Sequence, residues 1–210
     1  MVLLSLNATP ACGQINHSDQ LINIASNNRG KITTAVRAIR DQGGSEYYAL
    51  MTALFNGELY LHNNDLVIIG ETREDDYGDT FAPLYTVYPK RQPITDDAGK
   101  HLSKNVFDLE EIDSNRRIRA LIQPYLTRTE LFHPDPDKRR IAAEMLGNRG
   151  DLSIIPTLQK AIKEETNTGI QRFMRVAQAK IELTAPDPAI RQKAAKNLGE
   201  LNDTFVLPLL

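Results

Sequence analysis

Tryptophan is absent from this chain of 210 residues, and cysteine occurs once, at Cys12. One cysteine cannot form an internal disulfide, nor can it build a thiolate metal cluster. The four histidines lie far apart, so none has the close spacing of a zinc pair on one helix. No segment approaches the roughly 18 apolar residues that a membrane-spanning helix requires. The sequence therefore offers no pattern for a disulfide framework, a zinc cluster or a membrane span.

A large excess of one charge is also missing, because the formal net charge is −2. Bulk charge therefore does not indicate a nucleic-acid partner. The charges are unevenly placed: residues 1–114 carry 9 Lys/Arg and 16 Asp/Glu, whereas residues 115–210 carry 16 and 11. The basic second part has two explanations, namely cations on the solvent faces of helices, or a basic surface that meets an acidic partner or lipid headgroups.

Motifs of enzyme chemistry are lacking as well. The chain has no phosphate-binding Walker A loop, no dinucleotide-binding glycine pattern and no serine in a nucleophile elbow. The stretch REDDYGDT lacks the spacing and the closing glutamate of a calcium-binding EF-hand, so it is interpreted as an acidic turn. We therefore expect no enzyme, no metal and no cofactor.

The first 16 residues, MVLLSLNATPACGQIN, place a short apolar run before small residues. This order is typical of the end of a secretory signal, although a basic segment in front of the run is missing. Pro10 occupies a place where a lipoprotein signal has a small aliphatic residue, so lipidation of Cys12 is not expected.

Residues 17–57 are predicted to form a helical hairpin. Ile32, Ala35, Val36 and Ile39 recur at the spacing of one helix face. Gly43 and Gly44 follow as a stop, Ser45 is a candidate N-cap for the next helix, and Gly57 ends it.

Residues 58–114 are predicted to form a small β-insert with polar loops. The segments ELYLH and DLVIIGE flank Asn63-Asn64, which indicates a β-hairpin. The segment APLYTVYP is a third strand candidate. The polar stretches TREDDYGDT and PKRQPITDDAGKHLSKN are rich in turn formers and are expected to be exposed loops.

Residues 115–210 are predicted to be helical. Asn115 is expected to cap a helix that Pro124 should kink or shorten. The cluster Asn115, Arg116, Arg117 and Arg119 is a candidate interaction surface, because its arginines avoid the apolar face of that helix. Plain solvated helix surface is the competing interpretation.

A gapless repeat is the strongest pattern in the chain. Residues 133–158 and 185–210 agree at eleven of 26 positions. The members that define it are Asp135, Pro136, Arg139, Ala142, Leu146 and Gly147, matched by Asp187, Pro188, Arg191, Ala194, Leu198 and Gly199.

The residue type at most of these positions predicts a structural role. The aspartates should cap helices that begin at the prolines, and the alanines should allow a neighbouring helix to come close. The leucines should be buried, and the glycines should be left-handed C-caps. Between the copies, the residues Ile170, Phe173, Met174, Ala177 and Ile181 should form the buried stripe of another helix.

Amphipathic helical units of this kind stack on their neighbours. We therefore predict a mainly α fold, with helical hairpins stacked into an α-solenoid and a small β-hairpin and loop insert. The pattern DP…R..AA..LG resembles HEAT repeats. The hairpin of residues 17–57 also fits loosely, because a shift of 107 residues places Ala35 and Ile39 on Ala142 and Leu146.

The order of the regions resembles one family more closely. The signal-like start, the hairpin, LFNGELYLHNNDLVIIGE, PITDDAGK, NRRIRALI and the PDP repeat are similar to the N-terminal extracytoplasmic domain of the urea ABC transporter permease, of the branched-chain amino-acid type. The resemblance covers nearly the whole chain, without the membrane-spanning part of that family.

This resemblance implies a non-enzymatic protein-interaction domain on the periplasmic or extracytoplasmic side of the inner membrane. It implies a protein partner, either the urea-binding protein or another transporter subunit, and membrane association only through the permease part. We also expect the chain to be truncated before the transmembrane region. The alternative is a free-standing HEAT-repeat adaptor for another protein. A HEAT-like bilin lyase is a third hypothesis. It is weakened because the chain has few aromatic residues to hold a tetrapyrrole.

Overall fold

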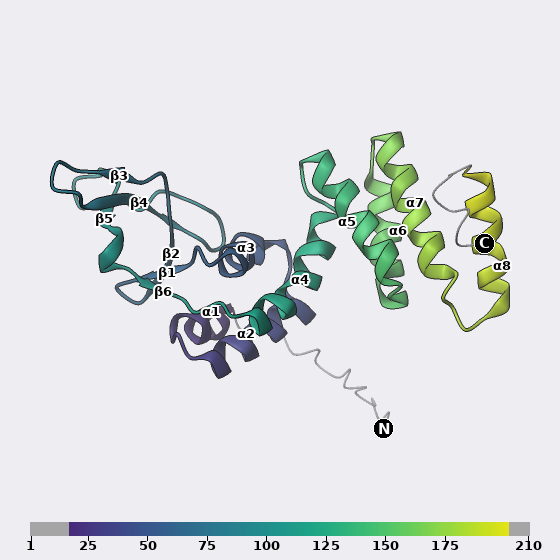
Figure 1. Cartoon of the computed structure of the whole chain (residues 1–210), viewed down its shortest axis with the longest axis horizontal. Coiled ribbons are helices and arrows are strands. Elements are labelled where there is room, and N and C mark those ends of the chain that lie inside the picture. The colour runs from purple at the N-terminus through teal and green to yellow at the C-terminus, as the bar shows by residue number, and fades with distance from the viewer. Residues whose placement is uncertain (1–16, 202–210) are drawn as a thin grey trace, which may run out of the picture. The chain divides into compact units, whose positions relative to one another are not determined.

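The computed structural model describes residues 17–201, and Figure 1 shows the arrangement of their helices and strands. The α-helices are α1 (His17–Ala25), α2 (Arg29–Gln42), α3 (Tyr48–Asn56), α4 (Arg116–Glu130), α5 (Pro136–Arg149), α6 (Ile155–Glu164), α7 (Thr168–Glu182) and α8 (Pro188–Glu200). Three 3-10 turns are η1 (Ser45–Tyr47), η2 (Val106–Asp108) and η3 (Leu152–Ile154). The strands are β1 (Tyr60–His62), β2 (Asp65–Ile69), β3 (Arg73–Glu74), β4 (Thr80–Thr86), β5 (Ser103–Asn105) and β6 (Glu110–Glu111). The predicted mainly helical fold with a small β-insert is confirmed. The signal-like segment 1–16 lies outside the described residues.

The chain divides into two compact units, residues 1–122 and 123–210, with the boundary inside α4. Pro124 lies within α4 but does not shorten it, because the helix continues to Glu130. Each unit has its own buried side chains, and each is described by itself below.

Helices α2 and α3 of unit 1 begin and end at local signals. The Asn28 side chain accepts hydrogen bonds from the backbone N–H groups of Gly30 and Lys31 and so caps α2. All four apolar residues predicted for its face are buried. Gly57 ends α3 in the left-handed region, with φ of 78°. The N-cap predicted at Ser45 is wrong, because Ser45 is already inside η1 and α3 has Tyr47 as its N-cap, without a side-chain bond.

The sheet of unit 1 is antiparallel and larger than predicted. Its order is β3-β4-β2-β1-β6, and β5 pairs with β4. Asn63 and Asn64 form the predicted hairpin turn, both with positive φ. The side chains of Val67, Leu84 and Leu109 form one of its buried clusters.

Two polar stretches that were expected to be loops are ordered hairpin turns with the same construction. In Asp75–Asp79 and in Asp96–Lys100, the first aspartate accepts hydrogen bonds from backbone N–H groups two and four residues later. The fourth residue in each is a glycine with positive φ, Gly78 and Gly99. Strands β3 and β5 were missed because they are only two and three residues long.

Unit 2 is a set of packed helices in which α7 contacts α5, α6 and α8 (Figure 1). Asp135 and Asp187 are N-caps, since their side chains accept hydrogen bonds from the N–H groups of Asp137 and Ala189. Both prolines lie in the first turn, as predicted. The core of unit 2 lies between α5, α6 and α7, and its buried residues include Leu131, Ala142, Ala143, Leu146, Leu158, Ala161, Met174, Ala177 and Ile181. A smaller buried cluster lies between α7 and α8 and contains Val176, Ala179, Ala194 and Leu198.

The helix bounds repeat along the chain. Helices α4 (Arg116–Glu130) and α7 (Thr168–Glu182) begin and end 52 residues apart, and each follows an asparagine, Asn115 or Asn167. Helices α2 (Arg29–Gln42) and α5 (Pro136–Arg149) begin and end 107 residues apart, as do η1 and η3. Within residues 17–201, a repeat of two helices followed by a 3-10 turn and a third helix therefore occurs twice, and its first two helices occur a third time. The sheet lies in sequence between the first and second copies.

The prediction that Gly147 and Gly199 are left-handed C-caps is wrong. Helix α5 continues to Arg149, and the left-handed residue is Gly150, with φ of 71°. Gly147 is buried inside the helix, where an added Cβ would lie 2.9 Å from the Cα atom of Ala177. Gly199 is likewise inside α8, which ends at Glu200. Gly147 therefore permits a close helix crossing instead of ending a helix.

Candidate functional site

The predicted arginine cluster lies at the first turn of α4. The Oδ1 atom of Asn115 accepts a hydrogen bond of 3.0 Å from the N–H of Ile118, so Asn115 is the N-cap. Arg116, Arg117 and Arg119 are exposed. Cations are unfavourable at a helix N-terminus, because the helix dipole presents partial positive charge there. These arginines are therefore not explained by helix stability.

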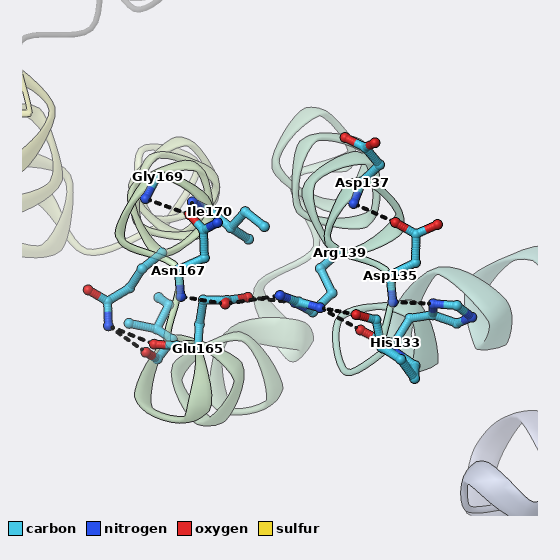
Figure 2. A network of polar contacts seen from close by, with 11 residues as sticks. His133, Asp135, Asp137, Arg139, Glu165, Asn167, Gly169 and Ile170 are labelled. Atoms are coloured by element: carbon cyan, nitrogen blue, oxygen red, sulfur yellow. Dashed lines mark hydrogen bonds and ion pairs between the residues drawn. The ribbon is translucent and has the colours of Figure 1, made fainter.

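A second group of polar residues is organised around Arg139 in unit 2 (Figure 2). Its Nε and Nη2 atoms donate to the two carboxylate oxygens of Glu165 at 2.6 and 3.1 Å. Its Nη1 atom donates to the carbonyl oxygens of His133 and Pro134, both at 2.8 Å. The Glu165 side chain is 2% exposed and that of Arg139 18%. The guanidinium therefore joins the turn before α5 to the loop before α7.

The network continues into the start of α7. Glu165 Oε1 also accepts a bond of 2.8 Å from the N–H of Asn167, whose own Oδ1 accepts from Gly169 and Ile170 (Figure 2). The hydrogen bonds from Arg139 hold the pKa of the Glu165 carboxyl below its usual range, and Glu165 raises the pKa of the guanidinium. The carboxylate is therefore held ionised as a structural anchor.

The matched arginine of the second copy makes the same contacts with the turn before its helix. Arg191 Nη1 donates to the carbonyl oxygens of Ala185 and Pro186 at 2.8 and 2.7 Å. Sequence reasoning matched Arg139 with Arg191 but assigned them no role. Their fixed position, four residues after a helix N-cap, was the signal that pointed to a shared task.

A groove lies between α5 and α7, and we call it the α5/α7 groove. It has a volume of about 290 Å³ and is lined by Arg140, Glu144, Gly147, Phe173, Val176, Ala177 and Lys180. Phe173 was predicted to be buried, but it is 43% exposed. Its exposure places an aromatic ring beside a floor of small residues.

The rim of the α5/α7 groove carries charge. The guanidinium carbon of Arg140 lies 5.9 Å from the centre of the Phe173 ring, within the range of a cation–π contact. The Nε atom of Arg140 lies 3.8 Å from Oδ1 of Asp137, and its Nη1 atom lies 3.7 Å from Oε2 of Glu144. The sequence contained no motif for this groove, because it combines residues from two helices that are separated by α6.

Within residues 17–201, no group of three or more histidine, cysteine or acidic side chains could hold a metal ion. None of the helices described here is long and apolar enough to cross a membrane. Comparisons with protein-family models, with curated proteins and with solved structures found no match for the chain.

Proposed function

We propose that the chain is a non-enzymatic protein-interaction module in which the repeated helix units stack in the manner of a HEAT-like α-solenoid. The observation that carries this proposal is the α5/α7 groove, which leaves the ring of Phe173 partly open to solvent beside a floor of buried small residues. An exposed apolar hollow with a charged rim is typical of surfaces that accept another protein. The repeated helix bounds and the packing of α7 against α5, α6 and α8 support the stacking.

Within this proposal, the chain is the extracytoplasmic part of a urea ABC transporter permease, and its partner is the urea-binding protein. The order of the sequence regions supports this assignment. The exposed cluster Arg116, Arg117 and Arg119 is the surface that we assign to this contact, because arginine pairs well with carboxylates at protein interfaces.

Calorimetric titration of the full chain with the urea-binding protein of the same genome tests the assignment. We expect saturable binding that weakens about tenfold when Arg116, Arg117 and Arg119 are replaced by serine. The matched control replaces Lys138 and Lys193, which are exposed on α5 and α8, and should leave the affinity unchanged.

Absence of binding, together with downstream DNA that encodes no permease, would reject the transporter assignment and favour the free-standing adaptor. The purified chain should hydrolyse neither ATP nor urea. Either activity, if a point substitution abolished it, would overturn the non-enzymatic proposal.

A further inference from the structure

The floor of the α5/α7 groove exists because Gly147 has no side chain. A Cβ at this position would lie 2.9 and 3.0 Å from the Cα and Cβ atoms of Ala177, so the two helices meet backbone to backbone here. Helices in such close contact leave a hollow beside the crossing point, and its walls are the longer side chains one turn away. Phe173 is the apolar wall of this hollow.

The positive charge of the groove is only partly balanced. Arg140 has two carboxylates close by, those of Asp137 and Glu144. Lys180 forms no ion pair among the residues that the structure describes. Lys180 lies seven residues after Phe173, which is two helical turns and about 10 Å along the axis of α7. One end of the groove therefore has the Phe173 ring beside the ion-paired Arg140, and the other end has the Lys180 ammonium.

We propose that the α5/α7 groove binds an acidic amphipathic helical segment of a protein partner. One large apolar side chain of that segment would rest on Gly147 and Ala177 beside the Phe173 ring. A carboxylate one or two turns further along would meet the Lys180 ammonium. This inference rests on the proposed interaction function and adds the chemistry of the partner.

The arrangement selects for this chemistry by two effects. Covering the exposed part of the Phe173 ring removes apolar surface from water, which favours an apolar anchor. The free charge of Lys180 then discriminates between flanking residues, because a carboxylate is attracted and an ammonium is repelled. Purely apolar segments lack the second contact.

Two short synthetic peptides provide the probe. Both present leucine and phenylalanine on one helix face, and they differ only in carrying glutamates or lysines on the flanks. They are titrated into the ¹⁵N-labelled full chain while the backbone amide signals are followed. We expect the acidic peptide to shift the signals of Gly147 and Ala177 saturably, and the basic peptide to bind about tenfold more weakly.

Variants then test the two ends of the groove separately. Phe173→Ala should weaken the acidic peptide about tenfold, because an exposed aromatic anchor is lost. Lys180→Glu should remove or reverse the preference for the acidic peptide. The matched control is Ile141→Ala, since Ile141 is 44% exposed on α5 but does not line the groove. Circular dichroism of each variant confirms that the helices are retained.

Equal affinity for the two peptides, or shifts that avoid the groove, would overturn this proposal. So would an Ile141→Ala effect as large as that of Phe173→Ala. The outcome is independent of the urea-binding protein: peptide binding without binding of that protein would reject the transporter partner and keep the groove.

Discussion

Arg139 and Glu165 combine charge with unusually complete hydrogen bonding. Removing two charges from water is costly, and only good geometry with further hydrogen bonds offsets that cost. Here the guanidinium meets both carboxylate oxygens and two carbonyls, while the carboxylate also accepts from the N–H of Asn167. The pair should therefore stabilise the arrangement of α5 and α7 as long as Glu165 is ionised.

This pair predicts a pH dependence of stability. The Glu165 pKa is lowered in the folded chain, so its contribution is present above the unfolded value of about 4.3 and is lost as the pH falls through the folded pKa. Glu165→Gln should lower the free energy of unfolding by about 2 kcal/mol at neutral pH and flatten its decline below about pH 4.5. Urea denaturation from pH 3 to pH 7 measures both effects.

Glu164 is the matched control for this measurement. Its side chain is 55% exposed and lies 4.0 Å from Lys160. An exposed pair of this kind contributes little, so Glu164→Gln should change stability by less than about 0.5 kcal/mol. Equal pH profiles for the two variants would contradict the role of Glu165.

The equivalent glycines Gly147 and Gly199 should respond oppositely to alanine. Gly147→Ala places a methyl group against the backbone of Ala177 and should destabilise by about 1–3 kcal/mol. Gly199 has no described atom within 4 Å of an added Cβ, so Gly199→Ala should be neutral or stabilise by up to about 1 kcal/mol. Thermal unfolding of both variants measures the two changes in stability. A similar loss of stability in both would show that close helix packing does not require glycine at position 147.

Among the elements, the repeated helices share their starting chemistry. The second helix of each of the three repeats has a side-chain N-cap, which is Asn28, Asp135 or Asp187. The first helix is capped in the same way in two repeats, by Asn115 or Asn167. A short side-chain oxygen accepting from the next turn is a local device, which needs no distant partner. The starts of these helices are therefore set within a few residues of sequence.

Loss of one such cap should be measurable at the start of its own helix. Asp135→Ala should cost about 1 kcal/mol, because the N–H of Asp137 loses its acceptor. Hydrogen exchange at Asp137 should accelerate, while exchange in α7 should stay nearly unchanged. Asp137→Ala is the control, since Asp137 is an exposed first-turn residue and not the cap; a larger cost for it would contradict the assignment.

At the scale of the whole molecule, the two compact units should unfold in separable steps. Domains with their own cores unfold as cooperative units. Leu84 is fully buried in the sheet of unit 1, whereas Gly147 lies in the helix packing of unit 2. In calorimetry of the full chain, Leu84→Ala and Gly147→Ala should therefore lower different transitions. A single transition lowered by both substitutions would show that α4 couples the units into one cooperative body.

The sequence alone determined what depends on neighbours along the chain. Periodic apolar residues, side-chain caps, prolines in first turns and the Asn63-Asn64 turn predicted most helices and the central hairpin, because each acts within a few residues. The short strands β3, β5 and β6 escaped prediction, since two or three residues show no alternation. Their pairing depends on β1 and β4, which lie at other places in the sequence.

Only the tertiary structure decided how equivalent residues are used. Gly147 was predicted to end a helix, but it lies where two helices cross, because Ala177 of α7 packs against it. Phe173 matched an apolar stripe but stays half open to water beside Arg140. In the sequence, Glu165 is indistinguishable from the many acidic residues of the surface. In the structure it is buried against Arg139 of α5. The physical reason is common to all three: burial, groove shape and charge pairing are set by contacts between helices, which the local sequence does not contain.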